Sequence, residues 1–480
     1  MGFFKKTWSN ISFFFSKIFL FFNKNIILKL KEKDLLKRIL FTLMVMIIFV
    51  SIGTITLPGI KISNSNGFDS ASFLGIMNTI GGGGLRQFSL VSLGISPYIT
   101  ASLVMTFAQT KLFPPIYHLY QSGPAGRMKI NYITYALTFV FSIVQAIVII
   151  QSLSNSASGQ SSYITIVSDF NNTFFIWIVL PFILTAGTFF SIFLAEQITN
   201  KGVGNGSSML ILAGSIITIP TLFTSAWSLW IQSKTGELLF RGIIYLIGFT
   251  LLFILLSLVI SFVYQAERRI PIQHTGVGRS KNIKDLSYLP IKVNASGIMP
   301  IIFASMLITF PMLIVNLVNQ FYPSDITRWM NDNFQLKKPI GLTLYASATF
   351  LLTIFLSIQQ SKIDKIVEDF NKSSTFIPGI VPGEQTEDYL FSIVIRLSIF
   401  SAIYLTILGS SQYIAIIAGS PENIVISGTS IMIVISVSIE TIQQIVARKK
   451  ALNLFKAKTI KKMKEADKSS NTEDQSSILW

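Results

Sequence analysis

The chain has 480 residues, of which 51% are hydrophobic and only 13% are charged. A soluble domain carries about 25% charged residues, whereas apolar runs of about 20 residues, which recur along this chain, match the thickness of the hydrocarbon core of a bilayer. The composition excludes an ordinary soluble protein and predicts an all-α polytopic membrane protein. The absence of cysteine excludes disulfides and thiolate metal sites, and the two histidines, His118 and His274, are too far apart in sequence to make a metal site alone.

The N-terminal residues 1–34 are basic, aromatic and amphipathic. Their apolar stretch Ile11–Phe22 resembles the core of a signal peptide, but Lys17 interrupts it, and Asn-Lys-Asn at 23–25 stands where small cleavage-site residues are expected. We therefore expect residues 1–34 to stay attached as a cytoplasmic segment on the membrane surface.

Ten apolar segments follow, each about long enough to cross a membrane as a helix. Their approximate limits are Ile39–Leu57, Val91–Leu112, Ile130–Leu153, Phe174–Ile198, Ser207–Phe223, Leu238–Tyr264, Leu289–Leu317, Ile340–Ile358, Leu390–Leu408 and Ile424–Val446. An even number of spans places both termini on the same side of the membrane.

Lysine and arginine lie mainly on one side of this predicted topology. Of the 39 such residues, 32 lie on the side shared with the termini and seven on the opposite side. The positive-inside rule therefore predicts that both termini are cytoplasmic. Topology accounts for most of the net charge of +17, so nucleic-acid binding, the other usual interpretation of such charge, is disfavoured. The basic clusters on the longer cytoplasmic loops remain available to contact a ribosome or an acidic protein.

The ten spans divide into two groups of five. Residues 35–223 carry the first five spans, and residues 224–450 carry the second five, with cytoplasmic loops at 265–288 and 359–389. An odd number of spans in each half permits an inverted repeat with a pathway at its interface, although the halves show no convincing sequence identity. The last residues, 451–480, are expected to form a basic cytoplasmic tail that is partly disordered.

The seventh span, Leu289–Leu317, is poorly suited to lipid. Asn294 and Ser296 are polar, and Gly297 and Pro300 weaken a helix within the same turn. Lipid offers no partner to a buried amide, so Asn294 must face protein or a water-filled cavity. This helix is therefore expected to line a pathway or to move.

Six sequence strings carry more specific information. They are SLGISPYITAS at 92–102, EQITNKGVGNGSS at 196–208, ERRI at 267–270, LPIKVNASGIMPIIFAS at 289–305, FIPGIVPGEQTEDYL at 376–390 and SGTSIMIV at 427–434. Together, in this order and in register with ten spans, they resemble the SecY family, the central channel subunits of the bacterial protein translocase. The N-terminal 34 residues and the tail after Leu454 carry no such match.

The resemblance implies ten transmembrane helices, in two inverted five-helix halves, around an hourglass pore in the plasma membrane. The implied function is a channel that moves unfolded secretory polypeptides across the membrane and releases transmembrane helices sideways into lipid. A bound SecA motor or a translating ribosome would drive it. The implied partners also include small SecE- and SecG-like membrane subunits, precursor polypeptides with their signal peptides, and membrane lipid.

By this resemblance, branched aliphatic side chains form a ring at the neck of the pore. The ring would comprise Ile95 and Ile99 in the second span, Ile211 in the fifth, Ile302 in the seventh and Ile433 in the tenth, with Ile298 as a further candidate. Ile95 and Ile99 are four residues apart and share a helical face, which is equally typical of isoleucines that face lipid or the core. Aliphatic side chains disfavour water and ions at a constriction, and they close around an extended polypeptide without binding any one sequence.

The resemblance also implies a plug at about residues 73–85, a short helix that closes the pore from the outer side. Its candidate residues are Phe73, Leu74, Ile76, Met77, Ile80 and Gly81. The glycines Gly81–Gly84 lack the preceding strand and following Lys-Ser/Thr of a phosphate-binding loop. A hinge is the favoured interpretation of this glycine run, because glycine permits steep backbone turns.

A lateral gate lies between spans 2–3 and spans 7–8 in the SecY family. Asn294 is expected to latch this gate, and Thr100 and Thr106 are its candidate partners. A polar pair between membrane helices contributes about 1–2 kcal/mol or less. Generic helix packing is the alternative interpretation of all three residues.

The two long cytoplasmic loops are implied to dock the motor or the ribosome through Arg268, Arg269, Gly383, Glu384 and Gln385. As plain sequence, the arginines are also consistent with positive-inside charge, and the Pro-Gly stretch with an ordinary turn. This chain has Val381 where the family usually has arginine. That departure weakens a residue-by-residue transfer of the motor contact.

Two further functions fit parts of the sequence. A secondary transporter of a small solute or ion also fits ten spans with broken helices, but few ionisable residues lie deep within these spans. A membrane-embedded enzyme is disfavoured, because the chain lacks HExxH, GxSG-type and paired mid-span aspartate motifs. We expect no catalytic activity, no cofactor and no metal, and the lack of a Walker motif implies that a partner supplies the energy.

Overall fold

The computed structural model describes residues 33–62, 75, 77–78, 81–110, 113–154, 164–166, 172–232, 234–274, 287–322 and 324–451. Most of the predicted N-terminal surface segment, residues 1–32, lies outside the described residues. The predicted tail from residue 452 onward also lies outside them.

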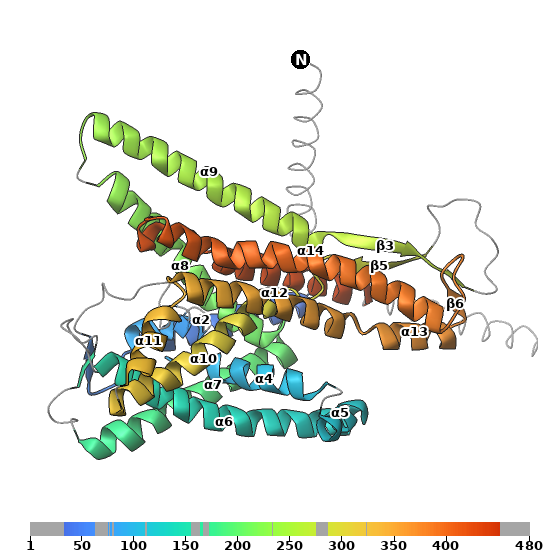
Figure 1. The fold of residues 1–480 in the computed structure, drawn as a ribbon, viewed down its shortest axis with the longest axis horizontal. Coiled ribbons are helices and arrows are strands. Elements are labelled where there is room, and N and C mark those ends of the chain that lie inside the picture. Colours follow the sequence, from blue (N-terminus) through green and yellow to red (C-terminus); the bar gives the residue numbers. More distant parts are fainter. Residues whose placement is uncertain are drawn as a thin grey trace, which may run out of the picture. The chain divides into compact units, whose positions relative to one another are not determined.

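Long apolar helices dominate the described chain (Figure 1). Within it, eight helices are long and apolar enough to cross a membrane, and each overlaps one predicted span. They are α2 (Lys33–Gly53), α6 (Pro124–Ser154), the π-helical η4 (Phe175–Val179) with α7 (Leu180–Lys201), α8 (Gly206–Trp230), α9 (Glu237–Gln265), α12 (Pro339–Ser361), α14 (Glu384–Ile417) and a last helix, Gly428–Ala451. The all-α polytopic fold class is confirmed.

The other two predicted spans correspond to α4 (Ser96–Ala108) and α10 (Met299–Phe321). With 13 residues, α4 is shorter than the roughly 20 residues that a hydrocarbon core requires. The apolar helix recognised within α10 covers Met299–Met312. The total of ten spans therefore stays a prediction.

Both of these helices begin later than the sequence predicted. The predicted start of α4 at Val91 is wrong, because Gly94 has a φ of +50° and Pro97 occupies the first turn of the helix. The prediction of helix from Leu289 is also wrong, since residues 288–292 form a strand and α10 begins at Met299.

The polar residues of the seventh predicted span therefore lie before the helix and not inside it. Asn294 and Ser296 are in the turn that leads from the strand to α10. Gly297 has a φ of +60°, and Pro300 occupies the first turn, where its missing N–H has no helical partner to lose. Gly297 and Pro300 thus start this helix, whereas the sequence interpretation had them weakening it.

Short elements connect the long helices. In the described part of the chain, three antiparallel strand pairs join β1 (Ile60–Ile62) to β2 (Ile164–Ile166), β3 (Glu267–Pro271) to β5 (Tyr288–Lys292), and β4 (Gln273–His274) to β6 (Thr375–Phe376). The short helices are α5 (Pro114–Gln121), α11 (Asp325–Asn333) and α13 (Ile363–Lys372), with 3-10 turns η2 (Gly84–Gln87) and η6 (Glu422–Ile424).

The chain packs as two compact units. Of the described residues, the first unit contains 33–47, Leu194–Gly206 and 438–451, and the second contains those within Ile48–Phe193 and Ser207–Val437. Within the first unit, Nη1 of Arg448 donates a hydrogen bond of 3.2 Å to the carbonyl oxygen of Gly202. All the candidate site residues that the structure describes lie in the second unit.

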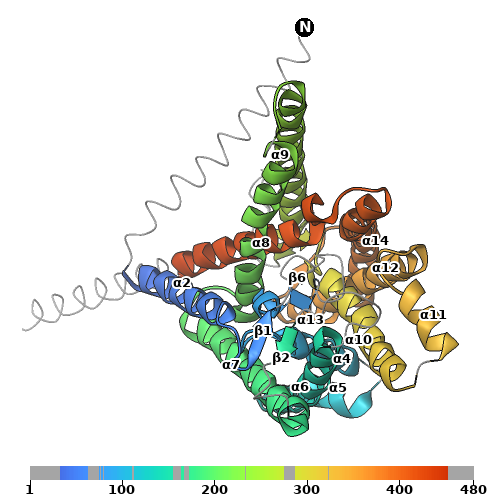
Figure 2. The ribbon, with the colours of Figure 1, turned by 90° about the vertical axis from the view of Figure 1, so that its left-hand side faces the viewer.

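Within the second unit, α12 and α14 pack side by side, α4 packs on α6, and α10 contacts α4, α6, α12 and α14 (Figure 2). Tyr345 of α12 meets Tyr413 of α14 edge to face, with 5.5 Å between the ring centroids. A Cβ atom at Gly409 would lie 2.9 Å from the Tyr345 hydroxyl oxygen. The absence of a side chain at Gly409 therefore lets Tyr345 lie against the backbone of α14.

Candidate functional site

The six isoleucines predicted at the pore neck are all buried. Their exposed fractions are 0% at Ile95, 7% at Ile99, 5% at Ile211, 9% at Ile298, 4% at Ile302 and 3% at Ile433. They belong to the start of α4, to α8, to the start of α10 and to the last helix. Burial excludes the lipid-facing interpretation for these positions, while their convergence into one ring stays a prediction.

The two helix starts that carry four of these isoleucines share one pattern. Gly-Ile-Ser-Pro at 94–97 is followed by Ile99, and Gly-Ile-Met-Pro at 297–300 is followed by Ile302. In each case the glycine has positive φ, the first isoleucine is the N-cap residue, and the proline lies in the first helical turn. The same type of helix start thus places a pair of isoleucines, four residues apart, at the beginning of both α4 and α10. Sequence reasoning missed this repeat, although its spacing is visible in the sequence.

The glycine run before α4 packs backbone against backbone. A Cβ atom at Gly94 would lie 1.6 Å from the carbonyl oxygen of Gly81, and one at Gly214 of α8 would lie 2.4 Å from the backbone of Gly82. Gly82 also has a φ of +97°, which side chains rarely adopt. In this structure these glycines permit close approach of neighbouring backbones, and their action as a hinge stays a prediction.

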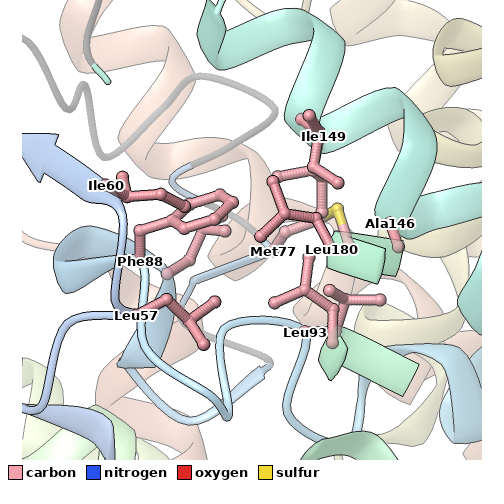
Figure 3. Packing of buried hydrophobic residues seen from close by; sticks show 11 residues of the cluster. Leu57, Ile60, Met77, Phe88, Leu93, Ala146, Ile149 and Leu180 are labelled. Atoms are coloured by element: carbon pink, nitrogen blue, oxygen red, sulfur yellow. The ribbon is translucent and has the colours of Figure 1, made fainter. Parts of the chain in front are cut away.

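Only two of the six predicted plug residues, Met77 and Gly81, lie within the described residues; Phe73, Leu74, Ile76 and Ile80 lie outside them. Met77 is 2% exposed and belongs to a buried apolar cluster (Figure 3). The cluster also contains Leu57, Ile60, Leu85, Phe88, Leu93, Ala146, Ile149, Ile150, Leu180 and Leu184.

The residue after Met77 ties this segment to the loop before α4. The carbonyl oxygen of Asn78 accepts a hydrogen bond of 2.7 Å from the N–H of Gly83. Its side-chain Oδ1 accepts a second bond, of 3.0 Å, from the N–H of Leu85. The described end of the predicted plug is therefore held by both backbone bonds and apolar packing.

Asn294 is 2% exposed, and its amide is bonded within the second half of the chain. Its Nδ2 donates to the carbonyl oxygen of Gly297 at 3.1 Å, and its Oδ1 accepts from the hydroxyls of Ser401 at 3.1 Å and Ser296 at 3.3 Å. Ser357 of α12 donates to Ser296 at 3.1 Å. Asn294 thus connects the turn before α10 with α12 and α14.

The two threonines expected to partner Asn294 make other hydrogen bonds in this structure. The Thr100 hydroxyl accepts a bond of 3.2 Å from Nε2 of Gln145 in α6 and lies 3.6 Å from Sδ of Met306 in α10. The Thr106 hydroxyl bonds to the carbonyl oxygen of Ser102 within its own helix. The hydrogen-bond partner of Asn294 on a neighbouring helix is Ser401 of α14, and the gate role of Asn294, Thr100 and Thr106 stays a prediction.

A line of contacts joins α4 and α6 to α10 and α12, and we call it the seam. The Thr100–Met306 contact is one part of it. The rings of Phe141 and Phe310 meet edge to face at 5.3 Å, and those of Phe107 and Phe355 stack at 5.0 Å. Nε2 of Gln359 donates to the carbonyl oxygen of Thr106 at 3.3 Å. In this structure the two sides of the seam are in contact through these side chains.

Sequence reasoning missed the amides of Gln145 and Gln359 at the seam. A glutamine in the middle of an apolar membrane helix is the type of residue that indicates a polar contact inside a bundle. That signal was available for Gln145, which lies within the 31-residue helix α6.

The arginines predicted to dock a partner lie on β3. Arg268 and Arg269 are exposed, opposite Ile291 and Pro290 of β5. The Arg269 guanidinium donates a bond of 2.9 Å to Glu267, which raises the pKa of Arg269, and it lies 4.8 Å from the centroid of the Tyr288 ring. The strand therefore fixes the position of both arginines on the surface.

The second predicted docking segment begins α14. Gly383, with a φ of +108°, is the N-cap residue, and Glu384 lies in the first turn, where a carboxylate stabilises the helix dipole. Gln385 and Val381 are exposed. The Thr386 hydroxyl donates to the carbonyl oxygen of Val381 at 3.0 Å and so fixes the turn.

These two loops, far apart in sequence, form one substructure. β4 pairs with β6, which joins the first loop to the second. A shared apolar core comprises Ile270, Ile291, Ile363, Val367, Ile377, Leu390, Ile393 and Val394. The sequence did not predict that the two loops pack together, because pairing between short strands far apart in the chain produces no recognisable local sequence pattern.

No cluster of three or more histidine, aspartate or glutamate residues capable of holding a metal is found in the part of the chain that the structure describes. The side chain of His274 lies outside that part.

Comparison with known proteins decides the family. A sequence model of the SecY family matches residues 89–442 of this chain. This chain belongs to the SecY family. The protein translocase subunit SecY of Mycoplasma pneumoniae is 37% identical to it over 392 residues, covering 81% of this chain and 80% of the relative. SecY of Mycoplasma capricolum is 34% identical over 457 residues, covering 94% and 93% respectively.

Solved structures agree with this assignment at the level of the fold. A structure described as that of a protein conducting channel has a TM-score of 0.58 at 17% identity and covers 87% of this chain and 94% of its own. Sec61 in the canine ribosome-channel complex has a TM-score of 0.52 at 17% identity, with 87% and 94% covered.

Membership of the SecY family establishes the function in outline. The chain is a multi-pass membrane protein and a channel subunit of the protein translocase, through which polypeptides are translocated. The predicted protein-conducting channel is thereby confirmed, and the alternative of a small-solute transporter is not supported.

Proposed function

We propose that this SecY-family chain passes unfolded secretory polypeptides through a neck lined by Ile95, Ile99, Ile211, Ile302 and Ile433, and that it releases transmembrane helices sideways through the seam. The observation that supports this most strongly is the burial of all these isoleucines, which come from four separate elements. Ile298 extends the set, because the helix start of α10 repeats that of α4.

A neck of branched aliphatic side chains explains two requirements of such a channel. It offers no hydrogen bonds, so water and ions are disfavoured when no polypeptide is present. It also has no affinity for any one side chain, so chains of varied sequence pass. The two isoleucine pairs at the starts of α4 and α10 place aliphatic groups on two neighbouring helices.

The plug, at about residues 73–85, would seal this neck when the channel is idle. Met77 supports the proposal by its burial among residues of α6, α7 and the loop before α4. Opening would remove Met77 from this cluster and break the bonds of Asn78 with Gly83 and Leu85. A passing polypeptide would compensate for that loss by replacing the plug.

The seam is the proposed lateral exit. Its contacts include the hydroxyls of Ser96 and Thr100 against the Met306 thioether, two aromatic pairs and one amide–carbonyl bond. In contrast, Asn294 bonds the start of α10 to α14, and Ser296 bonds it to α12. We infer that α10, α12 and α14 move as one body when the seam opens, so Asn294 holds the moving side together.

Energy would come from a bound partner. The substructure formed by β3–β6, α13 and the start of α14 would dock either the SecA motor or the ribosome through Arg268, Arg269 and the turn at Gly383–Gln385. The chain would itself be non-enzymatic, since its sequence carries no nucleotide-binding motif. The chain would lie in the plasma membrane. Both of its termini would be cytoplasmic, as the lysine and arginine distribution indicates.

Small SecE- and SecG-like membrane subunits would complete the channel. α2 exposes one face of apolar side chains, which includes Leu40, Met44 and Ile47. Such a helix requires either lipid or other membrane helices around it. The two inverted halves, residues 35–223 and 224–450, would surround the pore, and the Gly-Ile-x-Pro-x-Ile repeat supports that arrangement.

Reconstitution tests this function directly. The chain, purified with its membrane subunits, is placed in lipid vesicles with the SecA motor, ATP and an unfolded precursor, and protease protection of the precursor is measured. We expect protection in vesicles with the unaltered chain and little protection with an Ile302→Arg variant. A Leu251→Ser variant on the exposed surface of α9 is the matched control and should retain transport. Equal protection with and without the chain would contradict the proposal.

A further inference from the structure

The helix α11 lies between α10 and α12 and serves no part of the channel described so far (Figure 2). Its N-terminus carries a capping box, in which the Ser324 hydroxyl accepts from the N–H of Thr327 and the Thr327 hydroxyl accepts from the N–H of Ser324. The Thr327 hydroxyl also donates a bond of 2.8 Å to Oδ1 of Asn319 in α10. α11 is therefore a defined helix fixed to the end of α10.

The nine residues of α11 divide into three faces at helical spacing. Thr327 and Asn331, one turn apart, face the protein, since Thr327 bonds to α10 and Oδ1 of Asn331 is buried. A second face carries Ile326, Trp329 and Met330.

The third face of α11 is charged. Asp325, Arg328 and Asp332 are spaced three and four residues apart, and all three are exposed. The helix therefore presents an apolar face and a charged face side by side with the face that contacts the protein.

The apolar face of α11 is too exposed to be stable in contact with water alone. Ile326 is 72% exposed and Trp329 is 54% exposed, and Tyr322, between α10 and α11, is 78% exposed. The ring of Trp329 contacts Phe334 edge to face at 6.0 Å between centroids, which holds it in place. Exposed apolar area costs about 25 cal/mol per Å² in water.

The position of α11 along the chain identifies what covers this face. α11 begins where α10 ends and stops shortly before α12 starts, and the chain crosses the membrane, so α11 lies at a bilayer surface. Tryptophan and tyrosine are enriched at this boundary, where their rings sit among the lipid headgroups. A short helix with one apolar and one charged face is suited to lie in the plane of the interface.

We propose that α11 is a membrane-interface anchor that inserts Ile326 and Trp329 into the headgroup and acyl boundary of the adjacent lipid leaflet. Asp325, Arg328 and Asp332 remain on the water side. Because Thr327 bonds to Asn319, the anchor holds the end of α10, and the lipid surface thereby restrains one of the helices that line the seam.

Spin labels at matched positions test the proposal. The chain lacks cysteine, so Ile326→Cys, Arg328→Cys and Asp332→Cys each give one labelling site. Leu251→Cys in the middle of α9 is the reference for the bilayer interior. The full chain, with its membrane subunits, is placed in lipid vesicles, and the accessibility of each nitroxide to oxygen and to a water-soluble nickel chelate is measured by power saturation.

We expect a several-fold higher ratio of oxygen to nickel accessibility at position 326 than at positions 328 and 332, with the 326 value approaching that of position 251. A ratio at 326 equal to those at 328 and 332 would overturn the proposal, because the helix would then lie in water. Low accessibility of position 326 to both reagents would also overturn it, since a protein surface would then cover the face.

Discussion

The hydroxyl of Ser401 donates a hydrogen bond of 3.1 Å to Oδ1 of Asn294, joining two buried residues that are 107 positions apart. This bond connects α14 to the turn before α10. It explains how an amide is accommodated among apolar helices, because lipid cannot satisfy it. The bond lies on one side of the seam, since it joins Asn294 to α14 and does not reach α4 or α6.

The Asn294–Ser401 bond predicts energetic coupling between these residues. In a double-mutant cycle with Asn294→Ala and Ser401→Ala, we expect a coupling of about 1 kcal/mol in the free energy of unfolding. The matched cycle of Asn294→Ala with Thr100→Val should give coupling near zero, because Thr100 bonds to Gln145 instead. The measurement is unfolding in mixed micelles. Coupling of equal size in both cycles would contradict the assignment of Ser401 as the partner.

The contact between Thr100 and Met306 predicts that a tether across the seam blocks lateral release. In a Thr100→Cys, Met306→Cys variant, a short reducible thiol crosslinker should stop a transmembrane helix from entering lipid, and a reductant should restore its release. The chain has no other cysteine, and each single variant treated in the same way is the control. Release at an unchanged rate from the crosslinked chain would show that helices leave elsewhere.

The close approach of Gly94 to Gly81 predicts that Gly94→Ala is strongly destabilising. The new Cβ would overlap the carbonyl oxygen of Gly81, and the left-handed backbone adds about 1–2 kcal/mol. Gly248→Ala in α9 is the matched control, because its Cβ would meet no atom within 4 Å. We expect a clear drop in melting temperature for the first variant and none for the second. Equal melting temperatures would contradict the packing described here.

The exposed arginines of β3 predict charge-dependent docking. Arg268→Glu combined with Arg269→Glu should weaken binding of the ribosome or the motor several-fold, and the remaining binding should depend less on salt. The control is Lys338→Glu, which also reverses an exposed charge. Lys338 precedes the N-terminus of α12, whereas α13 follows the C-terminus of that helix. Affinity in sedimentation assays that is the same for both variants would place the docking surface elsewhere.

Hydropathy predicted the positions of the long helices, because a run of apolar residues is a local property. The stretch 289–298 was misassigned for the same reason, since its composition is apolar enough for a span. Part of this stretch belongs to β5, which pairs with β3 some twenty residues earlier in the sequence. No local sequence pattern predicts that pairing. Gly297 and Pro300 are visible in the sequence. That they mark the start of a helix becomes clear only once residues 288–292 are known to form a strand.

The partner of Asn294 could not be predicted for a related reason. The need for a partner follows from burial of one amide, but the choice among many serines and threonines depends on how α10 and α14 pack. The six isoleucines are buried, and their convergence at the neck stays a prediction. Gln145, Gln359 and the Gly-Ile-x-Pro-x-Ile repeat were visible in the sequence, but their role was not predicted.

Ion conductance tests most directly whether the buried isoleucines form the seal of the pore. The chain with its membrane subunits is placed in planar bilayers without precursor, and the resting current is compared with that of an Ile95→Ser, Ile211→Ser, Ile433→Ser variant. An Ile244→Ser, Leu251→Ser variant on the exposed surface of α9 is the control. We predict a large increase in resting current for the first variant and none for the control. A current unchanged in the triple variant would contradict the assignment of these isoleucines to the neck of the channel.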